Sequence, residues 1–256
     1  MGSRSMPLVT LSASLRKSLY ASRRLPNAQL GPYRLMNYVD SITRVVREVL
    51  AVDINDGVTF EPAGLRTQVI RDADPYAGVR ITVPARIDRA RHPLRIDINV
   101  GDPVTPEPVE VSLPSLLDEP FELVGYPLET VLAEKIVIMV DRGDATTRDR
   151  DFADVFLLTG RHSVDAEQLA AAVRATGAHR GSDLRPLRSV LVDLATVRQA
   201  DWTRSVARSG LEDSAPASLG EAIRAIVDFA DPILAGGVTS GVWDPATRRW
   251  RGHDNG

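Results

Sequence analysis

The chain has 256 residues, 43% of them apolar, and a formal charge of −3 from 31 Lys and Arg against 34 Asp and Glu. This composition excludes a disordered protein and supports one large domain or two small ones. The absence of cysteine excludes disulfides, thiolate metal sites and cysteine nucleophiles. No apolar run approaches the roughly 18 residues that span a bilayer. We therefore expect a cytoplasmic globular protein, in which any nucleic-acid partner is held by a local basic patch.

Residues 1–37 differ from the rest of the chain, because they are rich in arginine and serine and no acid precedes Asp40. This composition is also typical of organelle transit peptides. A poorly ordered or weakly folded arm accounts for it better. We predict a basic, acid-free arm over 1–37 that is disordered or of cloning origin.

A helix followed by strands is predicted next. Valine and isoleucine recur at helical spacing over residues 38–51. Apolar and polar side chains then alternate as in half-buried strands over residues 65–71, 78–87 and 94–103. Pro84 within the second of these segments favours an edge strand or a bulge.

A helix over residues 127–142 carries a lysine in its apolar stripe. Pro127 suits the first helical turn and Gly143 suits the end. Lys135 lies on the same face as Leu132 and Met139. Its ammonium group either extends to the edge of the apolar surface or lies in a cleft near an anion.

A second helix over residues 149–159 carries two carboxylates on one face, because Asp151 and Asp154 are three residues apart. Arg148 and Arg150, which precede Asp151, could contact phosphates. Ordinary capping also places acids in a first helical turn, where their charge opposes the helix dipole.

Strand signals cease after Gly160. Helices are predicted over residues 165–176, 186–197 and 218–235, and the end of the chain, with little to bury besides Trp243 and Trp250, is expected to fray. We therefore predict an α+β fold, with a core over 38–160 formed by a mixed sheet flanked by helices and a C-terminal helical lobe over 161–256.

Two further features of the strand region have alternative interpretations. Asp97 alternates with strand apolars and could bind a divalent cation in a cleft, or could lie on a solvated face with Arg95 as its partner. The basic segment of Arg86, Arg89, Arg91 and Arg95 could receive RNA phosphates, or could simply keep an exposed hairpin soluble.

Three segments resemble, in the same order, motifs of the AbiEii/AbiGii toxin family, relatives of the MenT toxins within the polymerase-beta-like nucleotidyltransferases. They are IDINVGD, YPLETVLAEKI and RDRDFADVFLL. The resemblance implies a nucleotidyltransferase toxin of a type IV toxin–antitoxin system, which transfers NMP from an NTP to an acceptor such as a tRNA 3′ end. It also implies Mg²⁺ as cofactor and a cognate antitoxin protein as partner.

The resemblance assigns roles to individual residues. Asp97 becomes a metal ligand, and Lys135 contacts the triphosphate, with Arg148 as a second nucleotide-binding residue. Asp151 and Asp154 support catalysis or position the lysine.

The family's first motif, a glycine turn followed by a D-x-D metal pair, is not recognisable before the helix near Tyr38. Two alternatives to an active transferase therefore stay open. The first is a catalytically degenerate member that binds nucleotide, RNA or an antitoxin. The second is an interaction module with none of these ligands.

Overall fold

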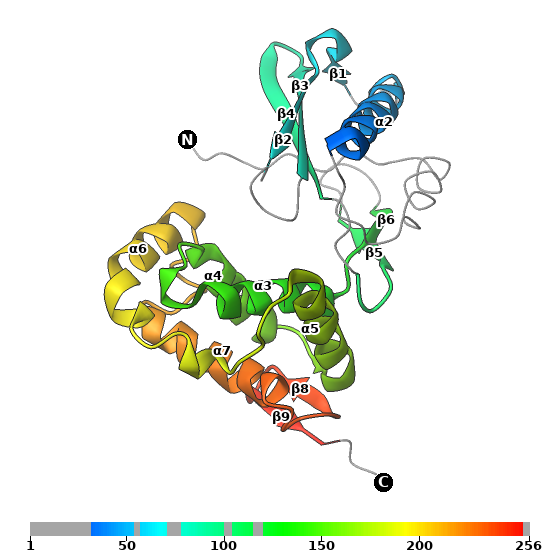
Figure 1. Cartoon of the computed structure of the whole chain (residues 1–256). Helices are drawn as coiled ribbons and strands as arrows, with labels where there is room; N and C mark the ends of the chain where they lie inside the picture. The colour runs from blue at the N-terminus through cyan, green and yellow to red at the C-terminus, as the bar shows by residue number, and fades with distance from the viewer. Residues whose placement is uncertain (1–31, 54–56, 71–77, 100–103, 115–119, 253–256) are drawn as a thin grey trace. The chain divides into compact units, whose positions relative to one another are not determined.

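The computed structural model describes residues 32–53, 57–70, 78–99, 104–114 and 120–252. The chain divides into two compact units, Met1–Asp102 and Pro103–Gly256, which are described separately (Figure 1). Helices and antiparallel strands occur in both units, so the predicted α+β class is confirmed. Within the described ranges, no helix is both long and apolar enough to cross a membrane.

The described part of the first unit contains the long helix α2 and a four-stranded antiparallel sheet. Helix α2 begins at Pro32, six residues before the predicted start at Tyr38; residues 1–31 of the predicted arm lie outside the described residues. The elements are α2 (Pro32–Leu50), β1 (Val58–Phe60), η1 (Pro62–Gly64), β2 (Arg66–Ile70), β3 (Gly78–Ile87) and β4 (Ala90–Asn99).

The core of this unit lies between α2 and one face of the sheet. Ile42, Val46 and Leu50 recur at helical spacing on α2 and are buried. They pack with three alternating β3 residues, Val79, Ile81 and Val83, which are fully buried. The period of two along β3 leaves the intervening side chains on the other face, which points away from this core.

The strand pairing corrects two expectations, the edge position of Pro84 and the mixed sheet. Strand β3 pairs with β1 and β2 along one edge and with β4 along the other, so Pro84 does not lie in an edge strand. Pro84 is tolerated because it falls where the neighbour changes from β2 to β1, and its carbonyl accepts a hydrogen bond from the Glu61 N–H at 2.9 Å. Every described strand pair is antiparallel, where we predicted a mixed sheet. Four of the pairs, β2–β3, β3–β4, β5–β6 and β8–β9, join consecutive strands through connections too short for the crossover that parallel pairing requires.

The second unit contains a helical core with two small antiparallel sheets. Its elements are β5 (Val109–Leu113), β6 (Phe121–Gly125), α3 (Leu128–Arg142), η2 (Gly143–Ala145), α4 (Asp149–Thr159), β7 (Val164–Asp165), α5 (Ala166–Arg180), η3 (Leu187–Ser189), α6 (Leu194–Ser209), α7 (Leu219–Leu234), β8 (Val242–Asp244) and β9 (Arg249–Arg251). Strands β5 and β6 pair with each other, and β8 pairs with both β7 and β9.

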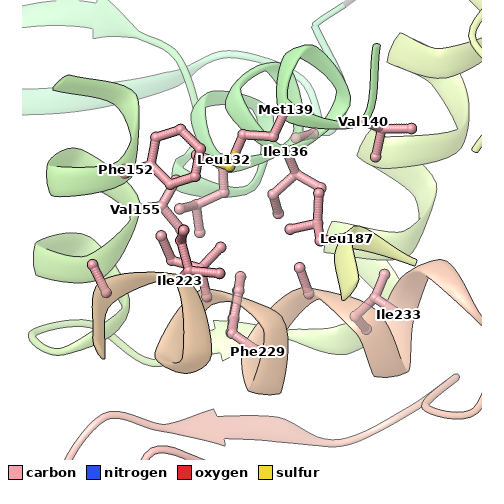
Figure 2. Close-up of a cluster of buried hydrophobic side chains, with 14 of the residues drawn as sticks. Leu132, Ile136, Met139, Val140, Phe152, Val155, Leu187, Ile223, Phe229 and Ile233 are labelled. Carbon is pink, nitrogen blue, oxygen red and sulfur yellow. The ribbon is translucent and has the colours of Figure 1, made fainter. Parts of the chain in front are cut away.

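One hydrophobic core joins the helices of this unit. Leu132, Ile136 and Met139 of α3 point toward Phe152 of α4 and Phe229 of α7 in Figure 2, and each is at most 1% exposed. Helices before and after residue 160 therefore share this core. The division into a core over 38–160 and a helical lobe over 161–256 stays a prediction.

Strands β8 and β9 form after Gly160, so the expectation of no strands there was wrong, and so was the expectation of fraying over residues 243–252. Residues 253–256 lie outside the described residues. Trp243 donates a hydrogen bond from Nε1 to the Thr159 carbonyl at 2.8 Å, and Trp250 donates to the Phe229 carbonyl at 2.9 Å. Both rings also contact the Phe229 ring, with centroids 4.9 and 5.3 Å away. These two tryptophans anchor the short segment, because Trp243 is buried, Trp250 is partly buried against the same core, and each indole N–H is satisfied.

The helix predicted over 186–197 was also wrong. The structure has the short helix η3 there, and α6 begins only at Leu194. The carboxylate of Asp144 accepts hydrogen bonds from the backbone N–H groups of Asp193 at 3.2 Å and Leu194 at 3.0 Å. A carboxylate that accepts hydrogen bonds from the free N–H groups of a first helical turn stabilises the start of that helix. For α6 this carboxylate belongs to Asp144, 50 residues before Leu194 in the chain.

Candidate functional site

Helix α3 fixes the position of Lys135. Thr130 ties the first turn of the helix to the segment before β5, because its hydroxyl donates to the Thr105 carbonyl at 2.7 Å. Leu132 and Met139, three residues before and four residues after the lysine, are buried in the core. The aliphatic part of Lys135 therefore lies along packed apolar surface, and its side chain is only 19% exposed.

The ammonium group of Lys135 contacts both carboxylates of α4. Its Nζ lies 2.7 Å from Oδ1 of Asp151 and 2.8 Å from Oδ2 of Asp154. The two acids reach the same ammonium because they are three residues apart on one helix face. The anions that the structure places beside this ammonium are carboxylates of the protein itself. A cleft in which Lys135 meets a bound anion stays a prediction.

Two arginines from the start of α4 complete the group. Arg148 donates from Nε to Oδ2 of Asp151, and Arg150 lies with Nε 3.7 Å from Oδ1 of Asp154. Lys135, Arg148, Arg150, Asp151 and Asp154 are called the Lys135 cluster from here on. With three cations and two carboxylates, the cluster carries one net positive charge.

Burial and ion pairing act on the same two groups in opposite directions. Burial disfavours the ammonium form of Lys135, but hydrogen bonds to Asp151 and Asp154 outweigh it, so the pKa of Lys135 is raised. Burial likewise disfavours the Asp151 carboxylate, yet hydrogen bonds from Arg148 and Lys135 lower the pKa of Asp151. Both groups therefore remain charged at neutral pH.

A second ion pair holds the first turn of α4 and was not predicted. Asp149 is 9% exposed and accepts two hydrogen bonds from Arg198 of α6, at 3.1 and 2.8 Å. Arg198 also lies 3.1 Å from Asp201. Asp149 and Arg198 are 49 residues apart, so no local spacing could have indicated this contact. The pair orients the start of α4, from which Asp151 reaches the lysine.

Asp97 lies in the first unit, on the face of β4 that points away from the core. Its two carboxylate oxygens accept hydrogen bonds from Nε and Nη2 of Arg80, both at 2.7 Å. Arg80 is the residue directly opposite Asp97 on β3, and their side chains are 42% and 43% exposed. This pairing raises the pKa of Arg80. The roles implied by the resemblance lead us to expect that Asp97, Lys135 and Asp151 meet in one cleft; because each unit is described by itself, this stays a prediction.

The described residues do not by themselves fit a divalent metal site. Within them, no three histidine, cysteine, aspartate or glutamate side chains are grouped so that they could hold a metal ion. Phosphoryl-transfer ions need several oxygen ligands, and both oxygens of Asp97 are directed at Arg80. A metal role for Asp97 therefore requires its pair with Arg80 to open and further ligands to join it.

The Lys135 cluster can bind an anion. An ammonium group has three N–H donors, of which Asp151 and Asp154 take two, so a third remains for a phosphate oxygen. Arg148 and Arg150 are 47% and 68% exposed, so their guanidinium groups are accessible to a bound anion. The cluster is thus a rigid ammonium group with two accessible guanidinium groups beside it.

Comparison with known proteins gives one match. A family model described as nucleotidyl transferase AbiEii toxin, type IV TA system, matches residues 35–228. The matched range covers most of the chain and includes Asp97 and the whole Lys135 cluster. Neither the curated proteins nor the solved structures contain a significant match to the chain.

Proposed function

The chain belongs to the AbiEii family of nucleotidyltransferase toxins of type IV toxin–antitoxin systems, and we propose that it transfers NMP from an NTP to the 3′ end of a tRNA in the cytoplasm. A cognate antitoxin protein would oppose this activity. The observation that carries the proposal is the Lys135 cluster, in which a half-buried ammonium is fixed by two carboxylates of the segment that resembles a family motif.

In the proposed reaction, a hydroxyl oxygen of the acceptor bonds to the α-phosphorus of the NTP, and the proton of that hydroxyl passes to solvent water. The bond from that phosphorus to the bridging oxygen breaks, and pyrophosphate leaves with the electron pair. Lys135 would donate its third N–H to the triphosphate, and Arg148 would contact a neighbouring phosphate oxygen. Fixed cations stabilise the charge that develops on the leaving group without having to reorganise.

Asp151 and Asp154 have a positioning role in this scheme. They hold the Lys135 ammonium at one point, and the raised pKa of Lys135 keeps that group charged when a phosphate binds. The same carboxylates repel phosphate oxygens, so the nucleotide is expected to approach from the side of Arg148 and Arg150.

A transfer assay tests this proposal. Each of four NTPs, labelled at the α-phosphate, is incubated with total tRNA and the full chain, with Mg²⁺ or with EDTA. We expect label on tRNA from at least one NTP, and loss of that label when Asp151→Asn loosens the lysine. The matched control is Asp183→Asn, since Asp183 is 83% exposed and pairs only with an exposed arginine in the described structure. Absence of transfer from all four NTPs contradicts the proposal.

The second candidate is a catalytically degenerate member that binds nucleotide, RNA or an antitoxin. It is favoured by the hydrogen bonds from Arg80 to both oxygens of Asp97 and by the lack of a three-ligand group among the described residues. Lys135 and Arg148 attract phosphates by charge alone, so NTP binding would then depend little on Mg²⁺. Calorimetric titration of NTP with Mg²⁺ and with EDTA separates the two. Equal affinities without transfer support the degenerate member, and a strong Mg²⁺ requirement supports the transferase.

A further inference from the structure

The sheet of the first unit has a second face, opposite α2, with a strongly biased composition. We call it the outer face. In the pairing register, directly opposite residues of β2, β3 and β4 share a face, which places on this side the arginines Arg66, Arg80, Arg86, Arg91 and Arg95. Asp97 is the one acid at the described outer-face positions of these strands. Three of the five arginines were foreseen from sequence; Arg66 and Arg80 are brought beside them by the register.

The arrangement of these arginines is costly for an isolated sheet. Arg86 of β3 lies directly opposite Arg91 of β4, and like charges at opposite positions destabilise a strand pair. Arg66, Arg91 and Arg95 are exposed, and none of them forms an ion pair in the part of the chain that the structure describes. A bound anion between such side chains would remove the repulsion and supply the missing counter-charge.

The chemistry of the outer face fits a phosphate backbone better than a protein surface. Its centre carries Pro84 opposite Pro93, with threonine and glutamine nearby. Its large aliphatic side chain at a described position is Ile70, at the end of β2 opposite Gly78, so the centre of this face lacks the apolar anchor found at the centre of protein interfaces. Guanidinium groups spread over adjacent strands instead match repeated phosphates, which arginine binds in a bidentate way.

We propose that the outer face of the first unit binds the phosphate backbone of RNA through Arg66, Arg91 and Arg95. The inference rests on the proposed function only in taking RNA as the acceptor class. Binding of this kind needs neither NTP nor Mg²⁺, because it depends on charge and counterion release. The overall charge of −3 makes the local basic surface necessary for such a partner.

The test is fluorescence anisotropy of a labelled RNA stem-loop titrated with the full chain, in EDTA and without NTP, at several salt concentrations. The variant R66Q/R91Q/R95Q removes three phosphate contacts. We expect its binding to weaken by about tenfold or more and the slope of log affinity against log salt to fall by about 2. The opposite change, Asp97→Asn, removes the acid from this face and should tighten binding.

The control variant is R174Q/R208Q/R224Q, which makes the same change in net charge on helices of the second unit. These three arginines are exposed and form no ion pair among the described residues. Equal loss of RNA binding by both triple variants would overturn the proposal, since net charge alone would explain it. Polyglutamate that competes as well as RNA at equal charge would also overturn it, in favour of an acidic protein partner. RNA binding without label transfer would leave this inference standing while the proposed function fails.

Discussion

Replacement of Lys135 by methionine tests whether the Lys135 cluster stabilises the second unit. Methionine matches the aliphatic part of the lysine and keeps its contacts with the core. It removes the ammonium group, which makes hydrogen bonds of 2.7 and 2.8 Å to Asp151 and Asp154. The side chains of Lys135 and Asp151 are only 19% and 7% exposed, so solvent replaces these bonds poorly.

The loss of stability in Lys135→Met depends on which interactions Asp151 and Asp154 keep when the ammonium group is removed. A hydrogen bond to a charged group contributes about 1.5–3 kcal/mol, and removing one partner of a buried ion pair costs about 3–5 kcal/mol. Asp151 keeps its bond from Arg148, and Asp154 is 29% exposed and can hydrate. We therefore expect Lys135→Met to lower the free energy of unfolding by about 2 kcal/mol, which lowers the Tm by about 4–8 °C for a unit of this size.

Thermal unfolding followed by circular dichroism measures this loss. The control is Arg174→Met on an exposed helix position without an ion pair in the described structure, which should change stability by less than about 0.5 kcal/mol. The variant K135M/D151N/D154N should recover at least half of the loss, because no unpaired carboxylate remains. An unchanged or higher Tm for Lys135→Met would refute the reasoning and show that the desolvation of these charges cancels their attraction.

Three further predictions concern the same unit. The pKa of Asp151 is lowered in the folded state, so its carboxylate stabilises the fold at pH values above the unfolded pKa near 3.8, and this stabilisation is lost as the pH falls through the folded pKa. The difference in unfolding free energy between wild type and Asp151→Asn should therefore shrink below about pH 4. Urea titrations at several pH values measure this difference, and a constant difference would contradict the prediction. Arg198→Gln leaves Asp149 buried without its bidentate partner and should cost about 2 kcal/mol in the same urea assay, whereas no loss would mean that water replaces the arginine. Asp144→Ala removes the cap of α6 and should cost about 1 kcal/mol and increase amide exchange at residues 192–194; unchanged exchange there would show that the cap is unimportant.

Local patterns predicted much of the fold. The strand over 78–87 has the bounds of β3, and the helices predicted over 127–142 and 149–159 correspond to α3 and α4. In each case a regular apolar period, or a proline and a glycine at the ends, determines the element from nearby residues alone. The apolar stripe also predicted that Lys135 would lie either at an edge or beside an anion.

Contacts between distant residues could not be predicted in this way. Arg80 and Asp97 are 17 residues apart and meet only because of the β3–β4 register. The Asp144 cap determines where α6 begins, although the local pattern suggested an earlier start. Arg198 similarly reaches Asp149 through tertiary packing. Such contacts depend on the fold as a whole, which spacing along the chain does not encode.

The most direct test of the central claim, that the Lys135 cluster binds the triphosphate during nucleotide transfer, compares transfer rates of wild type and Lys135→Arg. Arginine keeps the positive charge and the partner acids, but its planar guanidinium cannot place one compact charge where Asp151 and Asp154 hold the ammonium. The measurement is the initial rate of label transfer from an α-labelled NTP to tRNA, with the Tm of both proteins determined in parallel. We expect a rate loss of about a hundredfold or more for Lys135→Arg, with a Tm within a few degrees of wild type. A Lys135→Arg protein that is folded and transfers nucleotide at the wild-type rate would contradict it.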